Sequence, residues 1–286
     1  MTAEIHDVPN DDQLIDVIGN SSVGIAVTDS EGSVLLHNKA LAVLTGGETP
    51  HLRDRVAVSG AGEGLAHLLG LLEKDGRIEH VAVTYRDGAG HERAAHVNAV
   101  RVGEGKKARI HWVSRPELGK RLPVSDTAEA DAASDAAGWI RSVDAAPQPA
   151  LAPSRATADL MREFYQVAPV AIHLIGVDGG VMHANPADIA LVEYSKHPTE
   201  YVGGHIRRIY QDQGLVDDFL ARWDEDSPII NFRANFLTRE GAPRPVLIFS
   251  TAQAAGGSVS NTRCFVFSDP TPQRERDTVS AFGWPA

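Results

Sequence analysis

The stretch "SSVGIAVTDSEGSVLLHNKALAVLTG" covers residues 21–46 and has the pattern of a strand, a turn, a second strand and the start of a helix. A second stretch, "APVAIHLIGVDGGVMHANPADIALVEYS" at residues 168–195, has the same pattern. In both, apolar runs flank a turn that contains Asp and Gly, which is typical of a β-hairpin. The same strand–turn–strand–helix motif therefore occurs twice in the chain.

An ungapped alignment of the two stretches indicates common origin. A shift of 147 positions brings seven identical pairs together within 22 positions. These pairs are Val23/Val170, Ile25/Ile172, Gly32/Gly179, Val34/Val181, Asn38/Asn185, Ala40/Ala187 and Leu44/Leu191. Average residue usage gives about one or two identities over such a length. We therefore expect two related modules.

Composition limits the class of protein. A chain of 286 residues with 43% hydrophobic content is expected to form two domains. No apolar run approaches the roughly 20 residues of a membrane-spanning helix, and the acidic start lacks the features of a secretion signal, so we expect a cytoplasmic protein. The net charge of −11 disfavours nucleic acid and anionic membranes as partners. A single cysteine, Cys264, excludes an internal disulfide and a thiolate-rich metal site.

Each module reads as a helix, two strands, a helical region and three further strands. In the first module, Asn10 precedes the helix "DDQLIDVIG", and the last strands are "RIEHVAVTYR", "ERAAHVNAVRV" and "ARIHWVSR". In the second, the helix "ADLMREFYQV" comes first, and the last strands are "IINFRANFLTR", "RPVLIFSTAQ" and "TRCFVFSD". The segment "AAGGSVSN" between the last two strands is expected to be a loose loop.

The hairpin with its acidic-Gly turn, the following "HNKA" or "ANPA", the central helices and the three closing strands resemble the PAS sensory domain in both halves, over residues 11–116 and 157–270. The resemblance is more specific in the second half, which also contains "YVGGHIRRI". The resemblance implies an α+β fold with two PAS-like domains, each a five-stranded antiparallel sheet of strand order 2-1-5-4-3 with helices on one face. It also implies that small ligands or cofactors bind between the helices and the sheet, and that such domains pair with one another or with partner proteins.

The predicted domains are residues 1–116 and 157–270, joined by an Ala/Pro-rich linker at 117–156 and followed by a tail at 271–286. The linker is expected to be a mobile tether with a transient helix, because it contains few large apolar groups. Trp139 and Ile140 leave open a docked helix instead. The tail is too short for an output domain, so any signal is expected to leave through contact.

The second module is the predicted ligand site. Its proposed apolar wall consists of Phe219, Trp223, Phe232, Phe236 and Phe249. Counting by twos also places Ile230, Phe232, Ala234 and Phe236 on one face of a strand. His173 and His183 interrupt apolar strands, and His183 is the candidate polar contact, with a structural hydrogen bond as the plainer role for either. The alternative for the aromatic residues is that they simply form the core.

Other cofactor sites are not predicted. His67 is expected to face water rather than bind haem, since the leucines at 65, 68, 69 and 72 share the opposite side of its helix. His80, His96 and His111 lie on successive strands, but separate surface histidines are favoured over a metal site. Cys264 lies on the last strand, outside any "NCRFL" type of motif, so no cysteine-adduct flavin is expected. Asn38 and Asn185 are expected to hold the backbone where a strand turns into a helix.

We find no phosphate loop, HExxH, GxSxG or kinase or cyclase signature, and we expect no enzyme. The predicted function is that of a regulatory sensor or adaptor in signal transduction, acting through ligand binding, dimerisation and contact with a separate kinase, cyclase or transcription factor. The alternatives are a docking scaffold with self-filled pockets and a haem-binding gas or redox sensor. A homodimer is expected through the helices ahead of each module, at Leu14, Ile15, Ile18, Leu160 and Phe164.

Overall fold

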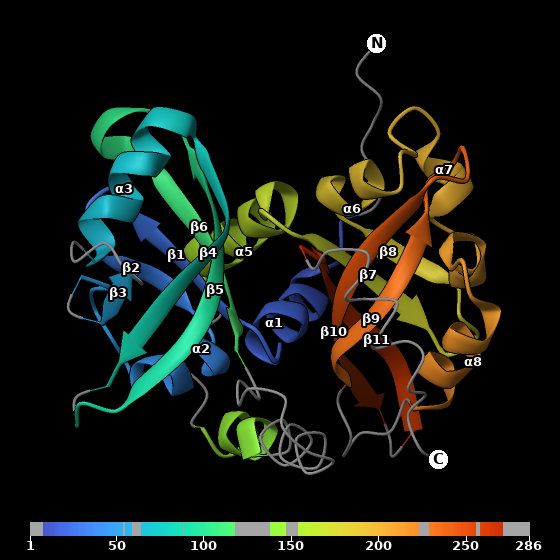
Figure 1. Ribbon diagram of the computed structural model, residues 1–286, viewed down its shortest axis with the longest axis horizontal. Coiled ribbons are helices and arrows are strands. Elements are labelled where there is room, and N and C mark those ends of the chain that lie inside the picture. The colour runs from blue at the N-terminus through green and yellow to red at the C-terminus, as the bar shows by residue number, and fades with distance from the viewer. Residues whose placement is uncertain are drawn as a thin grey trace.

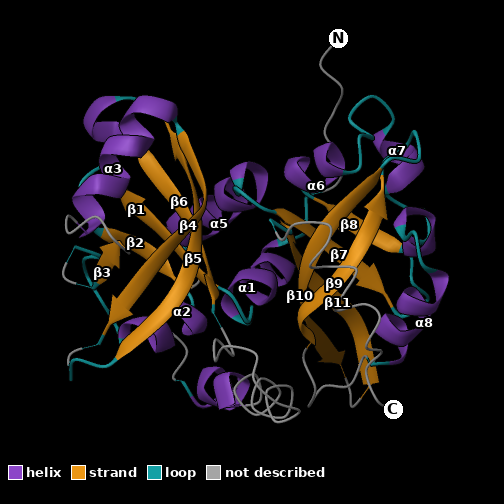
Figure 2. Cartoon of the chain, in the orientation of Figure 1, coloured by secondary structure: helices purple, strands orange, loops and turns teal. Residues whose placement is uncertain are grey.

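The computed structural model describes residues 8–53, 55–58, 64–87, 89–117, 138–146, 154–222, 229–255 and 258–270. These residues form two α+β domains, each built on one antiparallel sheet. Figure 2 shows the two sheets on either side of a central pair of helices, with α3 and α8 at the outer sides of the molecule. No helix of the described ranges is long and apolar enough to cross a bilayer.

Domain 1 contains six strands rather than the predicted five. Its elements are α1 (Asp11–Gly19), β1 (Gly24–Asp29), β2 (Val34–His37), α2 (Lys39–Thr45), β3 (Val56–Val58), α3 (Gly64–Asp75), β4 (Arg77–Arg86), β5 (Glu92–Val102), η1 (Gly105–Lys107) and β6 (Arg109–Pro116). The sheet order is β2-β1-β6-β5-β4-β3. The long strands therefore have the predicted order 2-1-5-4-3, and β3 adds an edge too short to show a period in the sequence.

Domain 2 has the predicted five strands in the order β8-β7-β11-β10-β9. Its elements are α5 (Arg155–Val167), β7 (Ala171–Gly176), β8 (Val181–Ala184), α6 (Pro186–Leu191), α7 (Pro198–Tyr201), η2 (Ile206–Ile209), α8 (Gln213–Ala221), β9 (Ile229–Leu237), β10 (Pro243–Ala255) and β11 (Ser258–Ser268). The predicted loose loop at 254–261 is wrong, because β10 and β11 continue to pair as far as Ala255 and Ser258. The domain boundaries themselves stay predictions.

Two asparagines fix the start of the helix after each hairpin. Oδ1 of Asn38 accepts hydrogen bonds from the backbone N–H groups of Ile25 and Leu41 at 2.9 and 3.0 Å, and its Nδ2 donates to the Val23 carbonyl. Asn185 makes the equivalent bonds to Ile172, Asp188 and Val170. The side chain therefore ties β1 to α2 and β7 to α6, as the sequence indicated.

A bulge in β9 changes which residues face the interior of domain 2. Asn231 has φ +56°, and the pairing of β9 with β10 shifts register beside it. As a result Ile229 joins the interior cluster, while Ile230 packs against clusters outside it. The prediction that Ile230 shares a face with Phe236 is therefore wrong, because a bulge breaks the period of two.

Large apolar side chains fill the interior of domain 1. Trp112 is buried, and its indole N–H donates to Oγ1 of Thr28 at 3.0 Å. The hydroxyl of Tyr85 lies 2.6 Å from Oγ of Ser114. The leucines that α3 presents to this core are Leu65, Leu68 and Leu72. Both polar atoms of the large aromatic side chains thus have partners inside the domain.

Part of the linker is a helix docked on domain 1. Residues 138–145 are helical, and the indole N–H of Trp139 donates to the Ser22 carbonyl at 2.9 Å. Trp139 and Val143 are buried in the domain 1 core cluster, and Ile140 packs against it. The docked helix, rather than a free tether, describes this part of the linker. Residues 118–137 and 147–153 lie outside the described residues.

Helices α1 and α5 pack between the two sheets (Figure 1). Their fully buried residues match under the shift of 147. These residues are Leu14 and Met161, Val17 and Phe164, and Ile18 and Tyr165. They form one apolar cluster with the facing sides of both sheets, so the face of each sheet that points away from its own domain's interior is covered by the other domain.

Charged residues repeat the same pattern across the domain interface. Asp16 on α1 forms an ion pair with Arg263 on β11 of domain 2. Glu163, which is Asp16 shifted by 147, lies 3.0 Å from Nε2 of His111 on β6 of domain 1. His111 and Arg263 lie opposite equivalent residues of the first strand in their sheets. Each helix therefore reaches the last strand of the other domain, as in a pseudo-two-fold pair.

The residues predicted to form a homodimer lie in this contact within one chain. Leu14, Ile18 and Phe164 have no exposed surface, and Ile15 and Leu160 pack against the same cluster. The second module supplies the apolar partner that the prediction assigned to a second chain. A homodimer through these residues would require the helices to exchange between chains, and it stays a prediction.

Candidate functional site

A buried histidine projects from β7 into the interior of domain 2. Ile172 and Leu174 face the domain interface, so His173 between them points to the opposite side of the sheet. Asp188 lies in the first turn of α6, positioned by the bond from its own backbone N–H to Asn185. Neither His173 nor Asp188 has any exposed surface. The asparagine cap and the strand pleat thus bring a carboxyl and an imidazole together in the core.

Asp188 binds two side chains through its two oxygens. Nδ1 of His173 lies 3.0 Å from Oδ1, and the hydroxyl of Tyr201 donates to Oδ2 at 2.7 Å. A carboxylate whose two oxygens both accept hydrogen bonds can stay ionised away from water. We call His173, Asp188 and Tyr201 the polar triad.

The contacts within the polar triad change the pKa values of His173 and Tyr201. Burial alone lowers the pKa of His173, but the Asp188 carboxylate outweighs it and raises this pKa to about 10. Burial, reinforced by Asp188, raises the pKa of Tyr201 well above its usual value. The raised pKa of His173 favours the imidazolium form of the ring beside Asp188, and the raised pKa of Tyr201 keeps its hydroxyl a neutral donor.

Cys264 lies on β11 directly opposite His173. Its thiol is buried and lies 3.5 Å from Oγ of Ser250 on β10. A small buried thiol is the role that the sequence indicated for this residue.

Three polar atoms in this interior have no hydrogen-bond partner among the described residues. They are Nε2 of His173, the hydroxyl of Tyr210 and Oγ1 of Thr262, all buried. The rings of His173 and Tyr210 pack near Phe236, with ring centroids at 6.3 Å for His173 and 4.9 Å for Tyr210. Buried polar groups are normally satisfied, so these atoms are the ones in this interior that could still form hydrogen bonds.

Three of the predicted wall residues surround this place. Phe219 and Phe236 are fully buried, and Phe232 is partly buried, with its ring 5.6 Å from Phe219. Tyr210 lies 6.1 Å from Phe219 and completes the aromatic group. Trp223 lies outside the described residues. Whether these side chains contact a ligand stays a prediction.

Two predicted ligand residues face the wrong side of the sheet. Phe249 follows the inward-facing Ile248 on β10, and it packs at the domain interface, 5.6 Å from Phe267. His183 lies opposite Leu174, whose side chain also faces that interface. Opposite residues of neighbouring strands share a face. Phe249 and His183 therefore do not line the interior, and His173 is the histidine that does.

Sequence reasoning missed Asp188, Tyr201 and Tyr210. The shift of 147 places Asp188 at the position of Leu41 and His173 at that of Ala26. A carboxylate and an imidazole at positions that are apolar in the related module were a usable signal. The two tyrosines had no such signal, because they lie in a region where the modules differ in length.

The histidines of domain 1 do not form a comparable group. His67 is only half-buried on α3. His96 lies opposite Arg115, whereas His111 lies opposite Val100, four positions further along β5, so the two are separate as predicted. The predicted surface position is wrong for His111, which is fully buried against Glu163 at the domain interface. No cluster of three or more His, Cys, Asp or Glu side chains suited to a metal ion occurs among the described residues of either domain.

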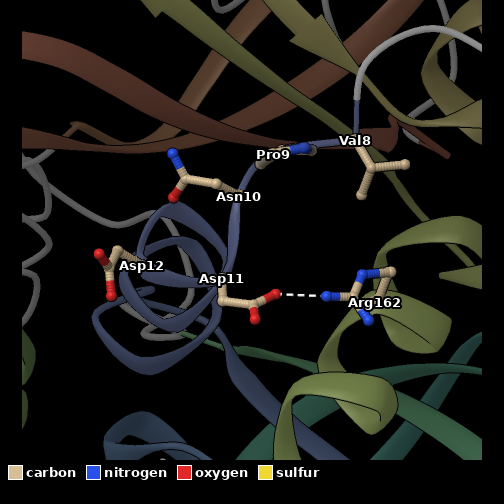
Figure 3. A pocket seen from close by; sticks show the side chains of 6 residues that line it. All are labelled: Val8, Pro9, Asn10, Asp11, Asp12 and Arg162. Carbon is tan, nitrogen blue, oxygen red and sulfur yellow. Dashed lines mark hydrogen bonds and ion pairs between the residues drawn. The ribbon is translucent and has the colours of Figure 1, made fainter. Parts of the chain in front are cut away.

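Figure 3 shows an open hollow of about 400 Å³ where α1 begins beside α5. It is lined by Val8, Pro9, Asn10, Asp11, Asp12 and Arg162. Asp11 and Arg162 form an ion pair across it. This hollow belongs to the domain interface, and its polar groups are exposed, unlike those of the triad.

No protein-family model and no curated protein matches the chain. Solved structures do. A PAS domain of an HTR-like protein from Haloarcula marismortui is 17% identical over 40% of this chain and 92% of its own, with a TM-score of 0.35. A PAS domain from a two-component sensor histidine kinase is 17% identical over 39% and 95%, with a TM-score of 0.34. An RNA-binding Light-Oxygen-Voltage receptor is 13% identical over 91% and 100%, with a TM-score of 0.40.

The PAS-like fold of both halves follows from the strand order and the capped hairpins.

Proposed function

We propose that this chain is a non-catalytic regulatory sensor or adaptor in which domain 2 binds a small molecule and domain 1 receives the effect. One observation carries the proposal: the interior of domain 2 contains a polar triad with unpartnered polar atoms, whereas Trp112 and other apolar side chains fill the same place in domain 1. A buried donor without a partner costs about 1–3 kcal/mol, which a ligand that satisfies it recovers.

Helix α5 offers a route from the interior of domain 2 to domain 1. Tyr165 is buried on α5, and burial together with the nearby Asp188 carboxylate raises the pKa of its hydroxyl. Two residues earlier, Glu163 accepts from Arg109 at 2.8 Å and contacts His111. A ligand transmits a signal only if it favours one of two arrangements of such an element. We propose that α5 is that element, and that a separate kinase, cyclase or transcription factor reads the result.

The test uses the full chain in two steps. Mass spectrometry of denatured protein identifies any retained small molecule, and a thermal-shift panel of metabolites identifies others. Hydrogen exchange with and without the ligand then follows the amides of α5 and β6. We expect a ligand that changes exchange in both elements. Glu163→Gln is the control variant, in which binding persists while the change in β6 shrinks.

A docking scaffold is the second candidate, because Phe219 and Phe236 are fully buried and fill much of the same interior. No ligand from either step would favour the scaffold and contradict the sensor. A ligand that leaves the exchange of α5 and β6 unchanged would support binding but contradict the proposed route.

A further inference from the structure

The hydrogen bonds inside domain 2 restrict the kind of molecule that it can take. Both oxygens of Asp188 are engaged, one by His173 and the other by Tyr201. Each carboxylate oxygen therefore already accepts a hydrogen bond, and one of the donors is the ring of His173. A cationic ligand would have to compete with His173 for the charge of Asp188.

The atoms that remain available are donors. Nδ1 of His173 is held by Asp188, and the charged ring also carries a proton on Nε2, which has no partner among the described residues. The hydroxyl of Tyr210 is likewise unpartnered and can donate. Both groups are buried, so a ligand atom that meets them leaves water behind.

The surroundings of these donors are aromatic. Phe236 lies beside both His173 and Tyr210, and Phe219 and Phe232 continue the apolar surface. Such walls favour a flat or apolar body. A ligand with an apolar body and an oxygen that accepts hydrogen bonds would suit both the aromatic walls and the buried donors.

Domain 1 provides an internal comparison. The positions of His173 and Asp188 are Ala26 and Leu41 there, and Trp112 takes the place of Cys264 opposite the first strand. The indole N–H of Trp112 already has its acceptor. At these equivalent positions, the unpartnered imidazole nitrogen therefore belongs to domain 2 and not to the fold that both domains share.

We propose that the interior of domain 2 selects a small apolar molecule carrying a carboxylate or carbonyl oxygen, to which His173 Nε2 and the Tyr210 hydroxyl donate hydrogen bonds. This inference rests on the proposed function, because it takes the interior of domain 2 as the sensing site.

The experiment compares three probes of similar size on the full chain, by calorimetry and thermal shift at millimolar concentration. Benzoate carries a carboxylate, benzamide a neutral carbonyl and benzylamine a cation. We expect benzoate and benzamide to bind and raise the melting temperature, and benzylamine to do neither. His173→Gln should weaken benzoate more than benzamide, because it removes the positive charge.

Tyr210→Phe is the decisive variant, since it removes a hydroxyl with no protein partner and should leave the melting temperature of the free chain unchanged. The loss of one hydrogen bond should weaken both oxygen-bearing probes roughly tenfold. Tyr85→Phe, a buried tyrosine of domain 1, is the matched control and should leave the affinities unchanged.

Three results would overturn the inference: failure of both oxygen-bearing probes, tighter binding of benzylamine, or benzoate binding that Tyr210→Phe and His173→Gln leave intact. The proposed function is separable from these outcomes. A metabolite from the broad panel that lacks an acceptor oxygen, yet changes α5, would retain the sensor while removing this ligand class.

Discussion

Domain 1 and domain 2 hold different residues at equivalent positions of the same interior. Ala26 on β1 corresponds to His173 on β7, and Leu41 in α2 corresponds to Asp188 in α6. The asparagine that caps the following helix is the same in both halves and makes three equivalent bonds, to which Asn38 adds one to the Ile18 carbonyl. The difference shows that the cap and hairpin build the fold, while the residues around them decide whether an interior is apolar or polar.

Removing the negative charge of the triad should have the largest effect. Asp188→Asn removes the counter-charge of His173, so the buried ring must lose its proton, and it weakens both hydrogen bonds that the carboxylate accepts. We expect a loss of about 3–5 kcal/mol in the free energy of unfolding, measured by urea titration. The control is the apolar triple replacement His173→Leu, Asp188→Leu and Tyr201→Phe, which makes domain 2 resemble domain 1 and should cost less than Asp188→Asn alone. If the triple variant is less stable than Asp188→Asn, the claim that His173 and Asp188 form a charged pair is contradicted.

The shared caps should respond equally in both halves. Asn38→Ala and Asn185→Ala each remove an amide with several buried hydrogen bonds, so we expect each to lower the free energy of unfolding by about 2–3 kcal/mol. Denaturant unfolding of the two variants measures both values. A clear difference between them would show that the two hairpins are not equivalent in energy.

The polar triad should also make stability depend on pH. The folded pKa of His173, about 10, lies above its unfolded value near 6.5, so the native state binds the extra proton between these limits. Its contribution is fully present below pH 6.5 and is lost as the pH rises toward 10, with a slope of up to about 1.4 kcal/mol per pH unit. Unfolding titrations between pH 6.5 and 9.5 measure it. The apolar triple variant should lose this slope, and an equal slope in that variant would assign it to other groups.

The two charged contacts between the domains, Asp16 with Arg263 and Glu163 with His111, should contribute unequally to stability, but the difference should be small. Asp16→Asn removes the carboxylate from the fixed charge of Arg263, which keeps its backbone carbonyl partners, and we expect a loss of about 1 kcal/mol. Glu163→Gln should cost less, because burial lowers the pKa of His111 and disfavours its charged form, and because the other partner, Arg109, is exposed. Thermal unfolding of both variants, and of Arg109→Gln, compares them. A loss for Glu163→Gln that exceeds both the loss for Asp16→Asn and the loss for Arg109→Gln would contradict a neutral His111.

Much of the fold could be predicted from the sequence. The repeat, the caps and the turn residues are local signals, and β4 and β5 begin and end at the predicted residues. The extra strand β3 and the bulge at Asn231 could not be predicted, because three residues show no period and a bulge interrupts one. The contact between domains was recognised as an apolar face but assigned to a second chain, since sequence does not say which surface covers it.

The site was predicted only in part. Phe219, Phe232 and Phe236 were identified from alternation and helical spacing, and all three lie around the triad. Phe249 was misplaced because its strand is apolar on both faces, one toward the core and one toward domain 1. Tyr201 and Tyr210 were missed. Tyr201 ends α7 and Tyr210 follows η2, and these short elements have no sequence period that shows which way their side chains point.

The most direct test of the difference between the two interiors is a long-range ¹H–¹⁵N NMR spectrum of the histidine side chains in the full chain at pH 8, with and without benzoate. We predict that one imidazole, lost in His173→Gln, is protonated on both nitrogens at this pH, and that benzoate shifts its Nε2 signal. A spectrum in which every imidazole is neutral at pH 8 and benzoate shifts none of them would contradict the account.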